Sequence, residues 1–475
     1  MIVALLMLAS IGLASAQNPA YNTPFTTSIT YQNISSSDAN ITFTFYPEGG
    51  GQSVTISKSL PAGAGSSLFI GNLTELPSNF SGSAVMASDQ PVVATLVQIP
   101  QNSTTVKNRP LSNGFSSASS QVLVATVLKN KFNTTTKFSV QNASGGAIDL
   151  KVQFFNADDP NAAPIELTAS NIPVGSAKMY DLGQMSEIPD PFNGSAVVTA
   201  TAAGTQNPAE IVASALELST NGAAARAFEG VNGGARTVYM PSALCNAFGA
   251  TSVYAVQNAG TAPTSVTVAY SSGQSDTRTI DPGKKESFNA CKKKDGSALN
   301  SAGFSGSATI TSTAADIVVI GKVGGGGRST AFLGETSGSS KLALPYVRWT
   351  SKENYDAGKR QRGFIAVQNI GTSTVSGVVV QYLNKNGEVV GTHTLPDIPA
   401  GEKQNSNASK ATLASGHQQI ELDEFGNPES NPGGGFGGAV IVQGPSGSQL
   451  IATVRISTGF NGGTVAEDYN GIAVQ

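Results

Sequence analysis

The sequence predicts an all-β chain built from four tandem antiparallel β-sandwich units. Three observations support this prediction: one unit is repeated four times, the apolar residues alternate with a period of two, and turn residues recur at regular intervals. No stretch carries a sustained apolar stripe with the 3.6-residue period of a helix. A helical or mixed α/β fold is therefore excluded.

Two short sequence motifs, which we call phrases, mark the repeats. A Gln-Asn pair ends an apolar run in each unit, and successive pairs are 109, 116 and 111 residues apart: Gln32-Asn33, Gln141-Asn142, Gln257-Asn258 and Gln368-Asn369. The phrase Phe-x-Gly-Ser-Ala begins at Phe80, Phe192 and Phe304, with a weaker form, Phe-Gly-Gly-Ala, at Phe436. A period of this length matches the usual size of one domain.

Within each unit the residue types are those of short strands. Residues 265–270 and 377–382 are rich in β-branched and aromatic residues, and Asn386-Gly387 is a typical hairpin turn. Two consecutive strands, such as 84–86 and 91–97, are expected to close each unit as a pair. Pro-Ala-Gly, Pro-Gly or Pro-Val-Gly turns precede this pair, at Pro61, Pro173, Pro282 and Pro399. This pattern favours β-sandwiches of immunoglobulin type, and four small barrels or another all-β unit is the alternative.

The repeats divide the chain into five predicted segments. Residues 1–16 form a signal peptide, and the four sandwich domains are expected at residues 17–112, 113–230, 231–336 and 337–475. The fourth domain contains an insertion near residues 416–435.

The N-terminal segment favours export. Residues 1–16 are apolar and end in Ala14-Ser15-Ala16, which matches the small-residue cleavage site of a signal peptide. Cleavage there would leave Gln17 at the mature end. No Lys or Arg precedes the apolar run, so a retained hydrophobic anchor or a misplaced start codon is the alternative. Because about 20 residues are needed to cross a bilayer, we expect no membrane span in the mature chain.

The composition limits the partners and the chemistry. Only 12% of the residues are charged, against about 25% in an average soluble domain, and the net charge is -3. This excludes the basic surface of a nucleic-acid-binding protein. Two His and two Cys leave little material for a metal centre. The surface must be covered by Ser, Thr, Asn, Gln and Gly, which is typical of an extracellular β-protein.

The two cysteines lie in the third unit. An exported protein with Cys245 and Cys291 in one domain is expected to pair them in a disulfide, and two buried free thiols are the alternative.

Glycosylation sequons are unevenly distributed. Asn-x-Ser/Thr occurs nine times, eight of them before residue 200: Asn33, Asn40, Asn72, Asn79, Asn102, Asn133, Asn142, Asn193 and Asn407. A glycan coat on the first two units is one interpretation, and the frequency of Asn-Ser and Asn-Thr turns is the other.

The C-terminal segment is short and apolar. Ile472, Ala473, Val474 and Gln475 follow the last aromatic-x-Gly phrase, where the earlier units continue into the next domain. This segment is a candidate for strand exchange with another subunit, and completion of its own sheet is the alternative.

No arrangement of residues predicts an active site, a metal site or a cofactor. His393 and His417 have no metal-spaced partner, and the glycine-rich segment 321–329 lacks the spacing of a phosphate-binding loop. Repeats fill almost the whole chain, so no catalytic domain remains, although paired carboxylates always leave a hydrolase as a formal alternative. The basic segment 359–362 and the nearby Trp349 and Tyr355 could contact a sugar or an anionic polymer, or form a solvated linker face.

The order of these phrases resembles the tandem immunoglobulin-like, cell-adhesion-related repeats of bacterial cell-surface proteins, including those abundant in filamentous phototrophic bacteria. The resemblance covers residues 25–474, and its motifs are turn and core phrases. It implies export, display on rods of domains and adhesive or structural roles, with no catalytic residue to carry over. The first unit departs from the pattern, because Tyr31-Gln-Asn-Ile-Ser replaces Val-Gln-Asn-x-Gly.

These observations lead to one expected function and one alternative. We expect a secreted, non-enzymatic structural protein of the cell surface, whose four units form a rod and assemble into a filament, sheath or surface layer. Its partners would be further copies or other cell-surface components. The alternative is an extracellular adhesin or carbohydrate-binding protein.

Overall fold

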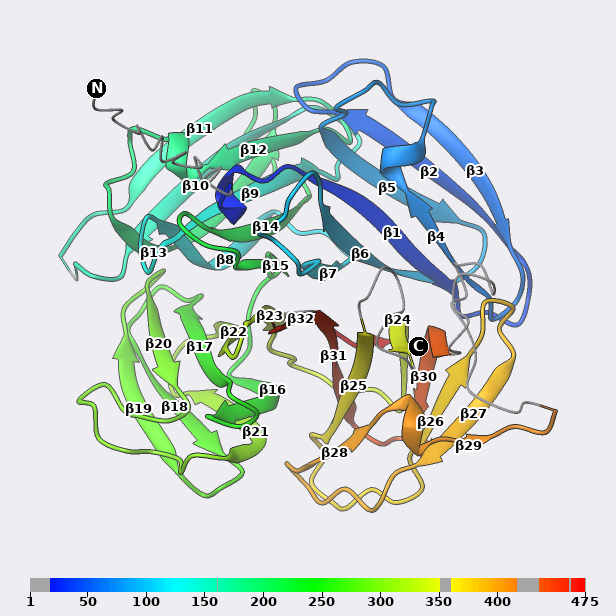
Figure 1. Ribbon diagram of the computed structural model, residues 1–475. Helices are drawn as coiled ribbons and strands as arrows, with labels where there is room; N and C mark the ends of the chain where they lie inside the picture. Colours follow the sequence, from blue (N-terminus) through cyan, green and yellow to red (C-terminus); the bar gives the residue numbers. More distant parts are fainter. Residues whose placement is uncertain (1–17, 160, 351–359, 417–434, 461–462, 475) are drawn as a thin grey trace, which may run out of the picture.

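The computed structural model describes residues 18–159, 161–350, 360–416, 435–460 and 463–474. The chain is all-β, and every strand pair is antiparallel (Figure 1). The few helices in the described residues are single 3-10 turns, and none of them has the length and apolar character needed to cross a membrane. The predicted signal peptide, residues 1–16, lies outside the described residues.

The strands form four groups in chain order, which we call repeats 1 to 4 (Figure 1). Repeat 1 follows η1 (Ala20–Asn22) and contains β1 (Phe25–Asn33), β2 (Ala39–Pro47), β3 (Val54–Leu60), β4 (Gly65–Phe69), η2 (Ile70–Asn72), β5 (Gly82–Ser88), β6 (Val92–Pro100) and β7 (Leu111–Asn113). Repeat 2 contains β8 (Gln121–Lys129), β9 (Thr134–Asn142), β10 (Ile148–Asn156), β11 (Ile165–Ile172), β12 (Ala177–Asp181), η3 (Leu182–Gln184), β13 (Phe192–Ala202), β14 (Ile211–Ser219) and β15 (Ala225–Glu229).

Repeats 3 and 4 continue the same series. Repeat 3 contains β16 (Thr237–Cys245), β17 (Thr251–Asn258), β18 (Thr264–Tyr270), β19 (Ser275–Ile280), β20 (Lys285–Asn289), β21 (Phe304–Ser312), β22 (Ile317–Gly325) and β23 (Arg328–Leu333). Repeat 4 contains β24 (Lys341–Thr350), β25 (Arg360–Asn369), β26 (Val379–Leu383), β27 (Val389–Thr394), β28 (Lys403–Ser406), η4 (Ala408–Lys410), β29 (Thr412–Leu413), β30 (Gly435–Gln443), β31 (Leu450–Phe460), β32 (Gly463–Asn470) and β33 (Ile472–Ala473).

One strand order recurs in all four repeats. If the eight strands of repeat 2 are numbered as positions 1 to 8, one sheet has the order 4-3-6-1 and the other the order 5-2-7-8. Repeat 3 has the same two sheets, and repeat 4 has the same neighbours, joined into one large sheet where Trp349 pairs with Arg362. The described part of repeat 1 has strands for positions 2 to 8, since β1 is the equivalent of β9 and the second sheet is β3-β2-β5.

This order corrects the expectation that consecutive strands close each unit as a pair. Residues 84–86 lie in β5 and residues 91–97 lead into and fill most of β6, but β5 and β6 belong to different sheets, as do β13 and β14. The turn signals located the strands correctly, but they carry no information about which sheet a strand joins.

The alternating residues explain the sheets. In β18, Val266, Val268 and Tyr270 are buried while the residues between them are more exposed, as a strand with one face on a core requires. Tyr254 and Phe288 face them from the opposite sheet and complete the core of repeat 3. Burial of such side chains stabilises each by about 2 kcal/mol relative to exposure.

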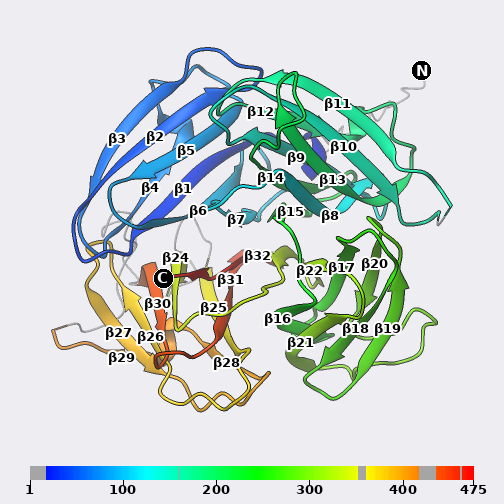
Figure 2. The same cartoon turned by 180° about the vertical axis from the view of Figure 1, so that it is seen from behind.

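The four repeats close on each other instead of forming the expected rod. Strands β7, β15, β23 and β32 each contact two others of this set and lie where the repeats meet at the centre (Figures 1 and 2). Repeat 4 also packs on repeat 1, since β24 contacts β1 and β6. The linear arrangement is therefore wrong for the single chain. Short linkers between repeats fit either arrangement, so the sequence pattern could not distinguish them.

The disulfide expected from the two cysteines is present. Cys245 ends β16 and Cys291 follows β20, so the bond joins the two sheets of repeat 3 across a sequence separation of 46 residues.

Removing this disulfide should destabilise repeat 3. The double variant Cys245→Ala/Cys291→Ala is expected to lose about 3 kcal/mol of unfolding free energy, because the link restricts the unfolded chain. Hydrogen exchange of the β17 and β22 amides measures this loss. A reductant should weaken the wild-type protein by the same amount and leave the double variant unchanged; equal protection in both proteins would contradict the prediction.

Candidate functional site

The repeated Gln-Asn pair has a structural role in every repeat. The Asn142 Nδ2 donates to the carbonyl oxygens of Gly146 at 2.8 Å and Ile172 at 3.0 Å, and its Oδ1 accepts from the Ser144 N–H. The same three kinds of bond are made by Asn33, Asn258 and Asn369, and all four side chains are fully buried. The side chain of each asparagine therefore links, by hydrogen bonds, the loop after the strand at position 2 to the chain at the end of the strand at position 4.

The other phrases meet at the boundary between repeats. The Ser195 Oγ of repeat 2 donates to the Gly283 carbonyl of repeat 3 at 2.6 Å, and Gln257 of repeat 3 donates to the same oxygen at 3.0 Å. We call this arrangement a joint. Two further joints are formed by Ser83 and Gln141 on Gly175, and by Ser307 and Gln368 on Gly401. The serine of Phe-x-Gly-Ser-Ala, the glutamine of Gln-Asn and the turn glycine thus form one interface.

Close packing at the joint explains why the turn residue is glycine. Gly283 has a φ of +72°, and a Cβ on it would lie 2.5 Å from the Phe155 ring of repeat 2. Gly175 stands in the same relation to the Tyr46 ring of repeat 1.

A glycine substitution measures the contribution of the joint. Gly283→Ala should cost about 2 kcal/mol more unfolding free energy than Gly273→Ala, because both have positive φ but only Gly283 faces a neighbouring repeat. Gly273 has nothing within 4 Å of an added Cβ, so it controls for the backbone penalty alone. Denaturant unfolding of both variants tests this, and equal losses would mean that the joint is not tightly packed.

The fourth boundary, between repeats 4 and 1, closes differently. Ala439 stands where the other repeats have the joint serine, as its pairing with Leu383 shows. The Gly65 N–H of repeat 1 instead donates to the Lys385 carbonyl at 3.1 Å, and an apolar cluster fills the contact. That cluster comprises Val93, Ala343, Leu383 and Ile441, with Ile34, Val389, Ile472 and Val474 around it.

Four equivalent position-8 residues meet at the centre: Asn113, Glu229, Leu333 and Asn470, which we call the hub. The Asn113 N–H donates to Glu229 Oε1, and the Asn113 Nδ2 donates to the Asn470 carbonyl at 2.8 Å. Asn470 accepts from the Leu333 N–H at 2.9 Å and donates back to the Leu333 carbonyl at 2.9 Å. The hub therefore links all four repeats by hydrogen bonds.

The carboxyl groups near the hub are strongly perturbed. Burial raises the pKa of Glu229 to about 7, and it raises the pKa of Glu335 to about 7 with a further contribution from the charge of Glu229. Glu217 differs: burial opposes its charge, but Lys322 and Arg226 hold its pKa below the usual range. Its carboxylate lies 2.6 Å from the Lys322 Nζ and 3.2 Å from the Arg226 guanidinium.

These carboxyls are bound by structural partners. Glu335 accepts from the Asn470 Nδ2, and Glu229 accepts from a backbone N–H. Within the ranges that the structure describes, no three His, Cys, Asp or Glu residues are grouped as metal ligands. The hydrogen bonds of Glu229 and Glu335 thus join residues of different repeats at the centre.

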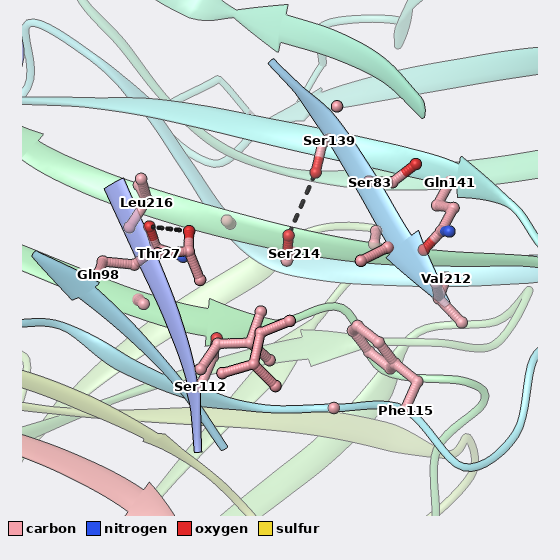
Figure 3. Close-up of a pocket in the computed structure, with 18 of the residues that line it drawn as sticks. Thr27, Ser83, Gln98, Ser112, Phe115, Ser139, Gln141, Val212, Ser214 and Leu216 are labelled. Carbon is pink, nitrogen blue, oxygen red and sulfur yellow. Dashed lines mark hydrogen bonds between the residues drawn. The ribbon is translucent and has the colours of Figure 1, made fainter. Parts of the chain in front are cut away.

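A cavity of about 750 Å³ lies between repeats 1 and 2. Residues of β1, β2, β5, β6 and β7 line it from repeat 1, and β9 and β14 line it from repeat 2. Figure 3 shows Thr27 and Gln98 on one wall and the hydrogen-bonded pair Ser139 and Ser214 on the facing wall. No local pattern in the sequence predicts this cavity, because it lies where the described part of repeat 1 has no strand at position 1.

The structure separates the predicted sequons into two groups. Asn33 and Asn142 are fully buried and their amide groups are already bonded, so the folded chain leaves no room for a glycan on them. This corrects the prediction for these two sites. Glycosylation stays a prediction for the others; Asn40, Asn72, Asn79, Asn102 and Asn133 are exposed, and Asn193 and Asn407 are half-buried.

The C-terminal segment lies against its own chain. Ile472 and Ala473 form β33, which pairs with Ala343 and Leu342 of β24, and the Val474 N–H donates to the Lys341 carbonyl. Exchange of this segment between subunits stays a prediction, and Gln475 lies outside the described residues. Residues 417–434, which make up most of the predicted insertion and contain His417, lie outside them as well, as does Tyr355.

The repeated phrases make contacts between the repeats, and the described residues enclose the cavity between repeats 1 and 2. Each conspicuous phrase of the sequence binds another part of the same chain, and the cavity walls are almost uncharged, with Lys137 as the single ionisable residue in the lining. No protein-family model and no curated protein sequence matches this chain.

Proposed function

We propose that this chain is an exported, non-enzymatic structural protein of the cell surface that assembles into a filament, sheath or surface layer. The observation that carries the proposal is the joint. The side chains of the repeated phrases donate hydrogen bonds to backbone carbonyls of the neighbouring repeat and so hold the repeats together. A protein whose repeated signature is its own domain interfaces is suited to a rigid building block.

Further features support the same proposal. The low content of charged residues and the disulfide fit an extracellular location, and residues 1–16 have the pattern of a removable signal peptide. We include in the proposal that the chain comprises four immunoglobulin-like sandwiches with rearranged outer strands. Their boundaries would follow the predicted segments 17–112, 113–230, 231–336 and 337–475. Its partners would be further copies or other surface components.

Electron microscopy tests this function most simply. The protein is purified from its native surface without denaturant and imaged directly. Ordered filaments or sheets with a repeating four-lobed unit would support the proposal. Dispersed single particles at all concentrations would overturn it.

A carbohydrate-binding role is the second candidate, and one aromatic pair favours it. Phe364 is 42% exposed and lies edge-on to Trp349, with ring centroids 5.9 Å apart. The Arg362 guanidinium covers the Trp349 ring at 4.5 Å, which leaves Phe364 as the open aromatic surface. A glycan array should then show binding that is lost in Phe364→Ala and kept in Phe248→Ala, an exposed phenylalanine elsewhere. Equal binding by both variants would exclude this patch.

A further inference from the structure

Three of the four boundaries between repeats contain a strand that has no equivalent in the described part of repeat 1. In repeats 2, 3 and 4 the strand at position 1 packs on the strands at positions 2 and 7 of the next repeat. β8 contacts β17 and β22, β16 contacts β25 and β31, and β24 contacts β1 and β6. In the described residues of repeat 1, β5 pairs with β2 alone and has no position-1 neighbour. The cavity lies at this place, because β9 and β14, positions 2 and 7 of repeat 2, form its far wall.

The open edge of β5 differs from its equivalents. Most of β5 is exposed or half-buried, and Val85 is 40% exposed, whereas the equivalent β13 is largely buried between β10 and β8. An unpaired edge beside an apolar cavity is a template for an added strand.

The position-1 strands of the other three repeats, β8, β16 and β24, indicate which kind of segment fits beside β5. β8 is buried along eight of its nine residues, on both faces, and its sequence from Val122 to Leu128 is apolar apart from one threonine. β16 and β24 also contain buried runs, from Met240 to Cys245 and from Leu342 to Val347, and all three strands run antiparallel to position 6. Lys137, the charged residue in the cavity lining, lies 3.1 Å from Asp181 and so needs no partner from an incoming segment.

We propose that repeat 1 is an acceptor for a β-strand donated by a different protein chain. The donor is an extended segment of about eight residues, uncharged and apolar on both faces, which adds antiparallel to β5 and packs on β9 and β14. The inference rests on the proposed function, in which other cell-surface components are the partners of the protein. A second copy is the less suitable donor, because its described C-terminal segment already pairs with β24 and would first have to leave that strand.

The probe is a synthetic peptide with the sequence of β8, Gln121–Lys129, added to the chain that begins at Gln17. We expect saturable binding, and slower hydrogen exchange of the β5 amides when the peptide is bound. The peptide carrying Val124→Asp should bind at least tenfold more weakly. In the protein, Val85→Asp should weaken binding at least tenfold, whereas Val174→Asp, at a valine 44% exposed and outside the cavity, should not.

Several results would overturn the proposal. One is no binding by the β8, β16 and β24 peptides up to about 1 mM; another is binding that Val85→Asp leaves unchanged. A further test compares the chain that keeps residues 1–16 with the chain that begins at Gln17. If only the shorter chain binds the peptide, residues 1–16 of the same chain fill the acceptor, and a donor from a different chain is wrong. Polymerisation of the pure Gln17–Gln475 chain through β5 would identify a second copy as the donor, again against the proposal.

The inference and the proposed function can fail separately. Native filaments in which the β5 amides are unprotected would overturn this inference and leave the proposed function intact. Peptide binding by a protein that never assembles would support this inference and overturn the proposed function.

Discussion

Raising the pH from 5 to 7 is expected to lower the unfolding free energy through Glu229 and Glu335 by about 4 kcal/mol. Both groups have a folded pKa of about 7 because desolvation in the folded chain disfavours their charged form, whereas an unfolded glutamate has a pKa near 4.3. The folded state therefore holds more protons than the unfolded state between these values. The stability that the two protonated groups contribute is complete below the unfolded pKa and is lost as the pH rises through 7.

The double variant Glu229→Gln/Glu335→Gln isolates this effect. Its unfolding free energy, measured by urea titration at several pH values, should change less between pH 5 and pH 7 than that of the wild type. Glu187→Gln, at an exposed residue, should keep the wild-type dependence. Above pH 7 Lys285 and Lys403, whose pKa values desolvation lowers to about 7, act in the opposite direction. A double variant with the wild-type slope below pH 7 would show that the hub carboxyls are ionised when folded.

Replacing Asn258 with alanine should destabilise repeat 3 by about 4 kcal/mol. The change removes three hydrogen bonds, to Ala262, Ile280 and Gly260, and leaves buried backbone groups without partners. Asn161→Ala, at an exposed asparagine, is the matched control and should change stability by less than about 0.5 kcal/mol. Denaturant unfolding of both variants tests this. A loss at Asn258 no larger than the control would mean that water replaces these bonds.

Local patterns in the sequence predicted the elements that depend on neighbouring residues. The alternation in residues 265–270 and the Asn386-Gly387 turn correspond to β18 and to the β26–β27 hairpin, where Gly387 has a φ of +83°. The pairing of Cys245 with Cys291 was also predicted, because two cysteines in one exported domain have few alternatives.

Features that depend on the packing of distant residues could not be predicted in this way. The repeated serine and glycine were recognised as turn phrases, but their partners lie in the next repeat, about 90 residues away. The cavity was missed for a similar reason: it exists because β5 has one neighbour, and no local pattern reports a missing neighbour. The perturbed pKa of Glu229 likewise depends on burial by strands from other repeats.

Small-angle X-ray scattering of the single chain tests the central claim that four repeats close around a hub. A compact chain of 475 residues has a radius of gyration of about 23 Å. We predict a value near this one, and a particle whose longest dimension spans about two repeats. A much larger radius, with the profile of an elongated rod of four domains, would contradict the account.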